Sequence, residues 1–142
     1  MVAEPRPSTY DDDYWLVTEA PGRGTGEAPG KWMVFVYAAD VDHYWALIRQ
    51  AVLTGSLGPS AKVATAKPNP NATNPRARLI CVYTADWRDR GDVRRVLRTL
   101  RGLGVSWRLS YKTDEATTSG QYGPGSSIYV SPPDSDDFDD RT

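Results

Sequence analysis

The feature that most constrains the fold of this chain is the order of its strand-like and helix-like segments. Hydrophobic residues recur at helical spacing from Val41 to Val52 and again within 90–103. Six segments rich in β-branched and aromatic residues are expected to be strands, at 14–18, 31–38, 60–66, 76–85, 106–112 and 126–131. Consecutive strands without an intervening helix pair most simply as antiparallel neighbours. The order therefore predicts an α+β fold, a mainly antiparallel sheet with two helices packed on one face.

The two ends of the chain differ in composition from its centre. Residues 1–13 and 132–142 are poor in core-forming side chains and rich in proline, serine and aspartate. Such segments bury too little apolar surface to offset the entropy of ordering. With a total length of 142 residues, we expect one domain over 14–131 with a disordered acidic tail on each side.

The formal charge of −1 conceals an uneven distribution of charge. Residues 1–13 and 134–142 hold nine of the 18 acidic residues but two of the 17 basic ones. The remaining centre, 14–133, has 15 bases and nine acids, a net charge of +6. A basic body favours an anionic ligand, with which the acidic tails would compete for the same surface. The alternative is that the tails serve solubility alone.

Several classes of protein are disfavoured by the composition. Mean hydropathy is −0.54, and the apolar run from Trp32 to Ala39 is far shorter than the roughly 20 residues that span a bilayer. A single cysteine, Cys81, permits no internal disulfide, and with a single histidine, His43, it cannot build a zinc site. We therefore expect a soluble, cytoplasmic protein with no membrane partner, no metal and no cofactor.

The residues left to perform chemistry are cationic and aromatic. The helix over 90–103 carries a row of arginines, which we interpret as a solvated face, with anion binding as the alternative. This row comprises Arg94, Arg95, Arg98 and Arg101. Within the strand over 60–66, alternation places Lys62 on the face opposite Val63, away from the core. A lysine with cationic neighbours loses its proton more easily and can then act as a general base.

Three segments carry a resemblance to a known family: GKWMVFV, VDHYWALIRQAVLTGSLGPSAKV and RLICVYTADWRDRGDVRRVLRTLRGLGV. Together they resemble, over roughly 14–125, the family of unknown function typified by the basophilic-leukaemia-expressed protein. The resemblance implies a fold similar to that of the cap-binding translation initiation factor, a curved antiparallel sheet with helices behind it. Bacterial members of that family resemble phosphothreonine lyases, whose type of domain also eliminates phosphate in the synthetases of lanthionine-containing peptides.

The lyase resemblance implies a role for several residues. In AKVAT, Lys62 is the counterpart of the base that removes the α-proton, and Lys31 in KWM is the counterpart of a phosphate-binding lysine. The remaining counterparts of phosphate-contacting residues are Arg76 or Arg78, Tyr83, and Lys112 in place of an arginine. The chain departs from the pattern at Met33, which replaces the histidine that protonates the leaving phosphate. Lys31 or Tyr83 is then the remaining candidate for the acid.

Three functions stay open at this point. The first is β-elimination of phosphate from a phosphorylated peptide or protein. The second is a binding module for a nucleotide or RNA, with aromatic side chains as stacking or peptide contacts. The candidates for this contact are Trp32, Tyr111 and Tyr122, with Trp87 and Trp107 as further tryptophans. The third is a degenerate lyase domain that binds phosphorylated partners without cleaving them.

Overall fold

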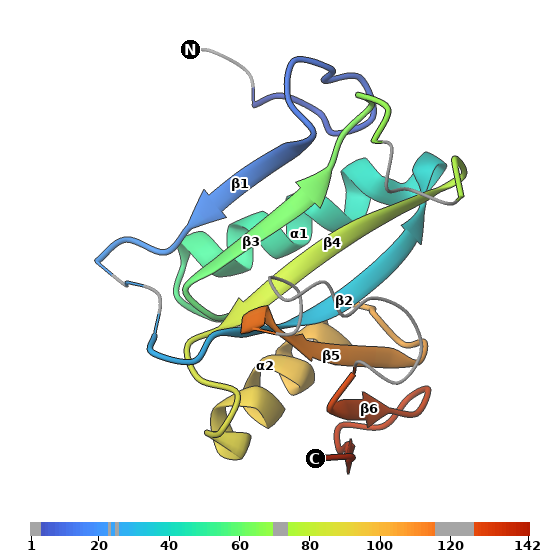
Figure 1. Ribbon diagram of the computed structural model, residues 1–142. Helices are drawn as coiled ribbons and strands as arrows, with labels where there is room; N and C mark the ends of the chain where they lie inside the picture. The colour runs from blue at the N-terminus through green and yellow to red at the C-terminus, as the bar shows by residue number, and fades with distance from the viewer. Residues whose placement is uncertain (1–3, 23, 25, 70–73, 116–126) are drawn as a thin grey trace.

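The computed structural model describes residues 4–22, 24, 26–69, 74–115 and 127–142 (Figure 1). Within them seven strands form one antiparallel sheet in the order β1-β3-β4-β2-β5-β6-β7. The strands are β1 (Trp15–Glu19), β2 (Gly30–Tyr37), β3 (Ser60–Ala64), β4 (Ala77–Thr84), β5 (Leu109–Thr113), β6 (Tyr129–Ser131) and β7 (Asp139–Asp140). The helices are α1 (Val41–Leu53) and α2 (Arg90–Gly102), with a short 3₁₀ turn, η1 (Ala38–Asp40), before α1. The predicted α+β fold is confirmed, and no described helix is long and apolar enough to cross a membrane.

Both helices lie behind the sheet in Figure 1 and cover one of its faces. They do so because each has one apolar side: α1 buries Trp45 and Ile48, and α2 buries Val96 and Leu97. On β2 the side chains that alternate toward the helices are fully or almost fully buried, namely Trp32, Val34 and Val36. The residues between them on β2, such as Lys31 and Met33, therefore project from the opposite side of the sheet, which we call the front face.

The C-terminal segment lies against α2, which differs from the expectation of a disordered tail. Phe138 packs with its ring centroid 4.5 Å from that of Tyr129 and 5.8 Å from that of Trp32. The acidic residues around it pair with the arginines of the helix, as Arg90–Asp140, Arg94–Asp137 and Arg98–Asp136. Arg94 and Arg98 of the arginine row are thus engaged by carboxylates of the C-terminal segment, because the two segments carry opposite charge and one aromatic side chain anchors them.

The N-terminal segment also makes contacts with the domain. The hydroxyl group of Ser8 donates to the carboxylate of Asp42 at 2.5 Å, and Glu4 pairs with Arg49 at 2.7 Å. These contacts are exposed, so each contributes about 1 kcal/mol or less to stability.

Replacing Phe138 by alanine is expected to lower the free energy of unfolding by about 2 kcal/mol. The loss is smaller than the ~3–5 kcal/mol of a fully buried phenylalanine because Phe138 is only half-buried. Urea denaturation would measure it, with Asp139→Ala as the matched control, since Asp139 is the exposed next residue. An unchanged unfolding free energy in Phe138→Ala would show that the ring does not anchor this segment in solution.

Candidate functional site

Three of the predicted site residues come together on the front face because of the sheet register. Lys31 pairs with Tyr83 on β4 and with Lys112 on β5, so these three side chains form one row across the sheet. Lys62 pairs with Cys81, and Cys81 pairs with Met33, which places a second row next to the first. We call Lys31, Lys62, Lys112 and Tyr83 the front-face lysine cluster.

The dimensions of a sheet allow these lysines to act on one ligand. Lys62 and Lys31 are two strands apart and offset by two positions, so their Cα atoms are about 12 Å apart. An extended lysine side chain is long enough to cover about half of that distance. Both ammonium groups act electrostatically on the thiol of Cys81, which lies between their strands. A ligand over Cys81 and Met33 would therefore lie within reach of both.

Lys31 and Lys112 are both buried, at 5% exposure each. The Nζ of Lys31 donates to Oδ1 of Asp114 at 2.9 Å and lies 5.7 Å from the centroid of the Tyr83 ring. Burial, together with the nearby charge of Lys31, lowers the pKa of Lys112. The two ammonium groups thus lie in a partly desolvated place where they repel each other; Asp114 pairs with Lys31, and a further anion in contact with both lysines would reduce the repulsion.

Two further titratable groups of the face, Tyr83 and Cys81, stay neutral. Burial raises the pKa of the Tyr83 phenol well above its usual value, so this hydroxyl is a hydrogen-bond donor rather than a base. Burial also raises the pKa of the Cys81 thiol to about 11, although the charges of Lys62 and Lys31 act in the opposite direction. Cys81 is therefore a neutral thiol packed in the sheet and not a nucleophile.

Lys62 has a different environment from the other two lysines. It is half-buried, and its Nζ lies 4.2 Å from the centroid of the Trp15 ring on β1. Within the described part of the chain, Lys62 makes no hydrogen bond or ion pair. The indole face attracts the ammonium group and orients the side chain over the sheet. Lys62 is consequently the lysine of the cluster whose nitrogen has an aromatic ring, and no hydrogen-bond or ion-pair partner, beside it among the described residues.

Sequence reasoning missed Trp15 and Asp114 as residues of this face. The signal for Asp114 was weak, because it follows Lys112 by two positions but lies beyond the predicted strand over 106–112 and beyond β5, which ends at Thr113. Trp15 could not be found in this way. Its contact with Lys62 depends on the pairing of β1 with β3, in which Val17 lies opposite Lys62, and pairing between separate segments is not encoded in either segment alone.

Neither of the two predicted arginines joins the cluster. Arg78 pairs with Val36, whose side chain is in the core, so Arg78 projects from the helix side of the sheet. Its guanidinium group donates to two nearby main-chain carbonyl groups. Arg76 precedes β4, at the end of the strand remote from Tyr83, and its carbonyl group accepts a hydrogen bond from Ala38. The predicted phosphate contacts of Arg76 and Arg78 are therefore corrected.

The stacking role predicted for Trp32 and Tyr111 is also wrong, because both residues are in the core at 0% exposure. Trp32 Nε1 donates to the carbonyl oxygen of Val93 at 3.1 Å, and the Tyr111 hydroxyl shares a 2.6 Å hydrogen bond with Thr84. These bonds satisfy their polar atoms within the protein. Tyr122, the third residue predicted for this contact, lies outside the described residues.

Met33 lies in the middle of the front face, between Cys81 on one side and Ser110 on the other. Its thioether carries no proton, so Met33 cannot act as the general acid that the lyase resemblance leads one to look for at this position. No group of three His, Cys, Asp or Glu side chains within the described ranges is arranged to hold a metal ion. The described polar groups around Met33 include the lysine ammonium groups, the Asp114 carboxylate and the Tyr83 phenol.

Comparison with protein families agrees with the resemblance seen in the sequence. Residues 22–118 match the family described as basophilic leukemia-expressed protein Bles03. The chain belongs to the Bles03 family. The matched range contains all four members of the front-face lysine cluster, whereas Trp15 lies before it and the segment that pairs with the arginines of α2 lies after it. The Bles03 description names no reaction, so a function for the site has to be argued from its geometry.

Proposed function

We propose that the front face binds a phosphorylated serine or threonine side chain of a peptide and that Lys62 removes its α-proton in a β-elimination. The observation that carries this proposal is the placement of Lys31, Lys62 and Lys112 on one face at neighbouring positions of the sheet. Tyr83 adds a neutral hydroxyl donor to the same row.

The phosphate lies, in this proposal, between Lys31 and Lys112. Each ammonium group donates charge-assisted hydrogen bonds, which are stronger than neutral ones. Both lysines are 5% exposed, so the surrounding effective dielectric constant is lower than that of water and their attraction for a dianion is correspondingly larger. The carboxylate of Asp114 holds Lys31 in position at 2.9 Å.

The elimination requires Lys62 as the neutral amine. Its nitrogen takes the proton from Cα, and the electrons of that C–H bond form the Cα=Cβ double bond. The Cβ–O bond breaks, and its electron pair leaves with the phosphate. The ammonium groups of Lys31 and Lys112 stabilise the charge that develops on the leaving group. Because Met33 supplies no proton, we expect a slow reaction in which hydrogen bonding replaces general acid catalysis.

A nucleotide-binding function has less support from the geometry. Its stacking candidates on β2 and β5, Trp32 and Tyr111, are both buried and hydrogen-bonded inside the protein. The cationic surface favours phosphate in either case, so the choice between peptide and nucleotide depends on what flanks the phosphate. Without an accessible aromatic platform from these residues, we favour the peptide.

A phosphothreonine peptide is expected to bind the wild-type protein at least about tenfold more tightly than the same peptide without phosphate. Replacing Lys112 by methionine, which keeps most of the length of the side chain, should lower the affinity at least about tenfold, since a hydrogen bond to a charged group contributes ~1.5–3 kcal/mol. Fluorescence polarisation measures the affinity, and mass spectrometry of the peptide detects loss of phosphoric acid.

The matched control is Lys67→Met. Lys67 is a lysine whose Nζ contacts the Tyr14 ring at 4.6 Å and the Asp12 carbonyl group, outside the cluster. Equal binding of the two peptides, or equal effects of the Lys67 and Lys112 variants, would contradict the proposed phosphate site. Phosphate-specific binding without any loss of phosphoric acid would support the proposed binding site and exclude the proposed elimination reaction.

A further inference from the structure

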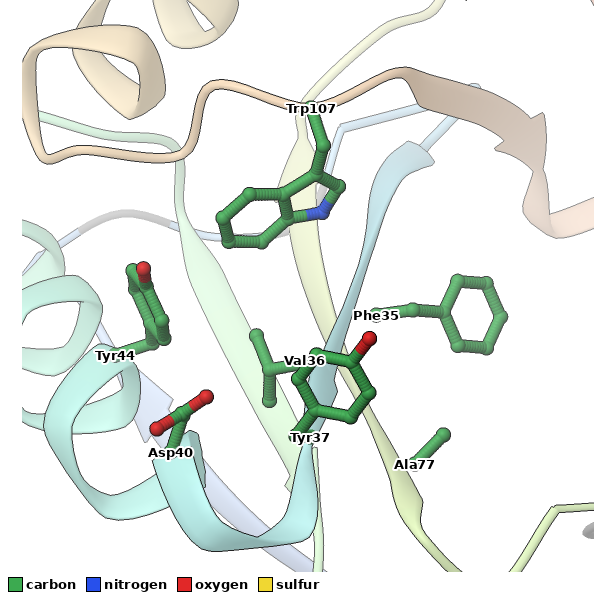
Figure 2. Close-up of a pocket in the computed structure, with 7 residues that line it drawn as sticks. All are labelled: Phe35, Val36, Tyr37, Asp40, Tyr44, Ala77 and Trp107. Atoms are coloured by element: carbon green, nitrogen blue, oxygen red, sulfur yellow. The ribbon is translucent and has the colours of Figure 1, made fainter.

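A pocket opens at the edge of β2, at the end of the strand remote from the lysine cluster (Figure 2). Its volume is about 480 Å³, and it is lined by Phe35, Val36, Tyr37, Asp40, Tyr44, Ala77 and Trp107. The pocket forms where β5 departs from β2, because their pairing ends at Met33 opposite Ser110. From Val34 to Tyr37, the edge of β2 that faces away from β4 has no partner strand among the described residues.

The walls of the pocket are mainly aromatic. Tyr44 and Trp107 lie edge to face, with ring centroids 5.3 Å apart and planes at 85°. Tyr37 is 74% exposed, and Figure 2 shows it, Tyr44 and Trp107 around the space above Val36. The faces of such rings carry negative electrostatic potential and attract cations.

One carboxylate accompanies these rings. Asp40 is exposed and takes the N-cap position of α1, yet its side chain does not cap the helix. It makes no hydrogen bond or ion pair with any described residue, unlike Asp42, which accepts from Ser8. Among the lining residues Asp40 is the one with a charge. The lining residue Ala77 lies between two arginines in sequence: Arg76 is exposed, and the guanidinium group of Arg78 is directed at main-chain carbonyls.

A further polar group at the pocket lacks a partner. The indole N–H of Trp107 is buried and makes no hydrogen bond within the described part of the chain. A buried donor without an acceptor is costly, so an acceptor brought by a ligand, such as a peptide carbonyl group, would be favourable. The unpaired edge of β2 beside it offers main-chain groups of the kind that bind an extended peptide as an added strand.

We propose that this pocket binds the ammonium end of a lysine side chain, free or methylated, on an extended peptide of a partner protein. The aromatic rings and Asp40 select the positive charge, and the edge of β2 and the Trp107 N–H bind the peptide backbone. This site is separate from the lysine cluster and of opposite charge preference, so it does not depend on the proposed phosphate chemistry.

The test uses three peptides of one neutral, extended sequence that carry lysine, trimethyllysine or acetyllysine at the centre. Full-length protein labelled with ¹⁵N is titrated with each, and the indole N–H signal of Trp107 reports binding. Both charged peptides are expected to bind at least about threefold more tightly than the acetylated one, as a cation–π contact implies. Asp40→Asn should weaken binding of the charged peptides and leave the acetylated peptide unchanged.

Two control variants separate this site from other effects of charge. Asp139→Asn removes an exposed carboxylate elsewhere and should leave all three affinities unchanged, as should Lys112→Met in the lysine cluster. Equal affinity of the charged and acetylated peptides, no effect of Asp40→Asn, or no shift of the Trp107 signal with any peptide would each overturn the proposal. Binding of the trimethyllysine peptide but not of the unmodified lysine peptide would restrict the proposed ligand to methylated lysine.

Discussion

Replacing Lys62 by alanine is expected to lower the rate of elimination by at least about a hundredfold and to leave the affinity for a phosphothreonine peptide within about threefold of wild type. We expect different effects on rate and on affinity because Lys62 lies in a different row from Lys31 and Lys112, which are proposed to hold the phosphate. A positioned general base contributes ~10²–10⁴ to a rate. Single-turnover assays with mass spectrometry of the dehydrated peptide measure this rate.

Lys62→Arg is the matched control for charge at this position. Arginine keeps the cation that Trp15 attracts, but its guanidinium does not lose a proton in proteins, so it should bind the peptide and fail to eliminate phosphate. Met33→His supplies the missing acid next to Cys81 and Ser110 and should raise the rate. Elimination that continues unchanged in Lys62→Ala would exclude Lys62 as the base.

The fold class was predictable because it depends on local periodicity. Helix α2 illustrates this: Asp89 accepts a hydrogen bond from the main-chain N–H of Asp92, and Val93, Val96 and Leu97 follow at helical spacing and are fully buried. The order of the strands was not predictable in the same way. The neighbours of β2 are β4 and β5, both later in sequence, and this arrangement depends on contacts between segments that share no local pattern.

Strand alternation placed Lys62 on the front face correctly, and the same rule would have shown that Arg78 and Trp32 do not lie on that face. Val63 is at 0% exposure, and Lys62 projects from the front face, as alternation indicated. The same rule places Arg78, five positions before Tyr83, on the opposite side of β4, and Trp32 opposite Lys31 on β2. Matching residues to a family motif took no account of the face from which each side chain projects.

The C-terminal segment was beyond prediction from composition for a different reason. Its run of aspartates reads as a disordered tail when considered alone. The arginines that pair with it are about forty positions earlier, as with Arg94 and Asp137, which are 43 residues apart. Complementary charge on two remote segments becomes a contact only where the fold brings the segments together, and Phe138 provides the apolar anchor that charge alone lacks.

Replacing Trp32 by alanine is expected to lower the free energy of unfolding by about 3–5 kcal/mol, the largest effect on stability that we predict. Trp32 is fully buried, donates to Val93 on α2, and packs edge to face on Tyr111 with ring centroids 5.3 Å apart. The substitution leaves a cavity between the sheet and α2 and removes the buried hydrogen bond from Trp32 to the Val93 carbonyl group. Urea denaturation followed by circular dichroism measures the change.

Tyr37→Ala, on the same strand, is the matched control. Its side chain is 74% exposed, so the loss should be within about 0.5 kcal/mol. If Trp32→Ala does not fold, Trp32→Phe keeps an aromatic ring, loses the hydrogen bond to Val93 and should give a smaller loss. A tryptophan that stacked on a nucleotide would show the reverse pattern, with stability nearly unchanged and ligand affinity reduced. A loss below about 1 kcal/mol in Trp32→Ala would therefore remove Trp32 from the core and restore the nucleotide-binding hypothesis.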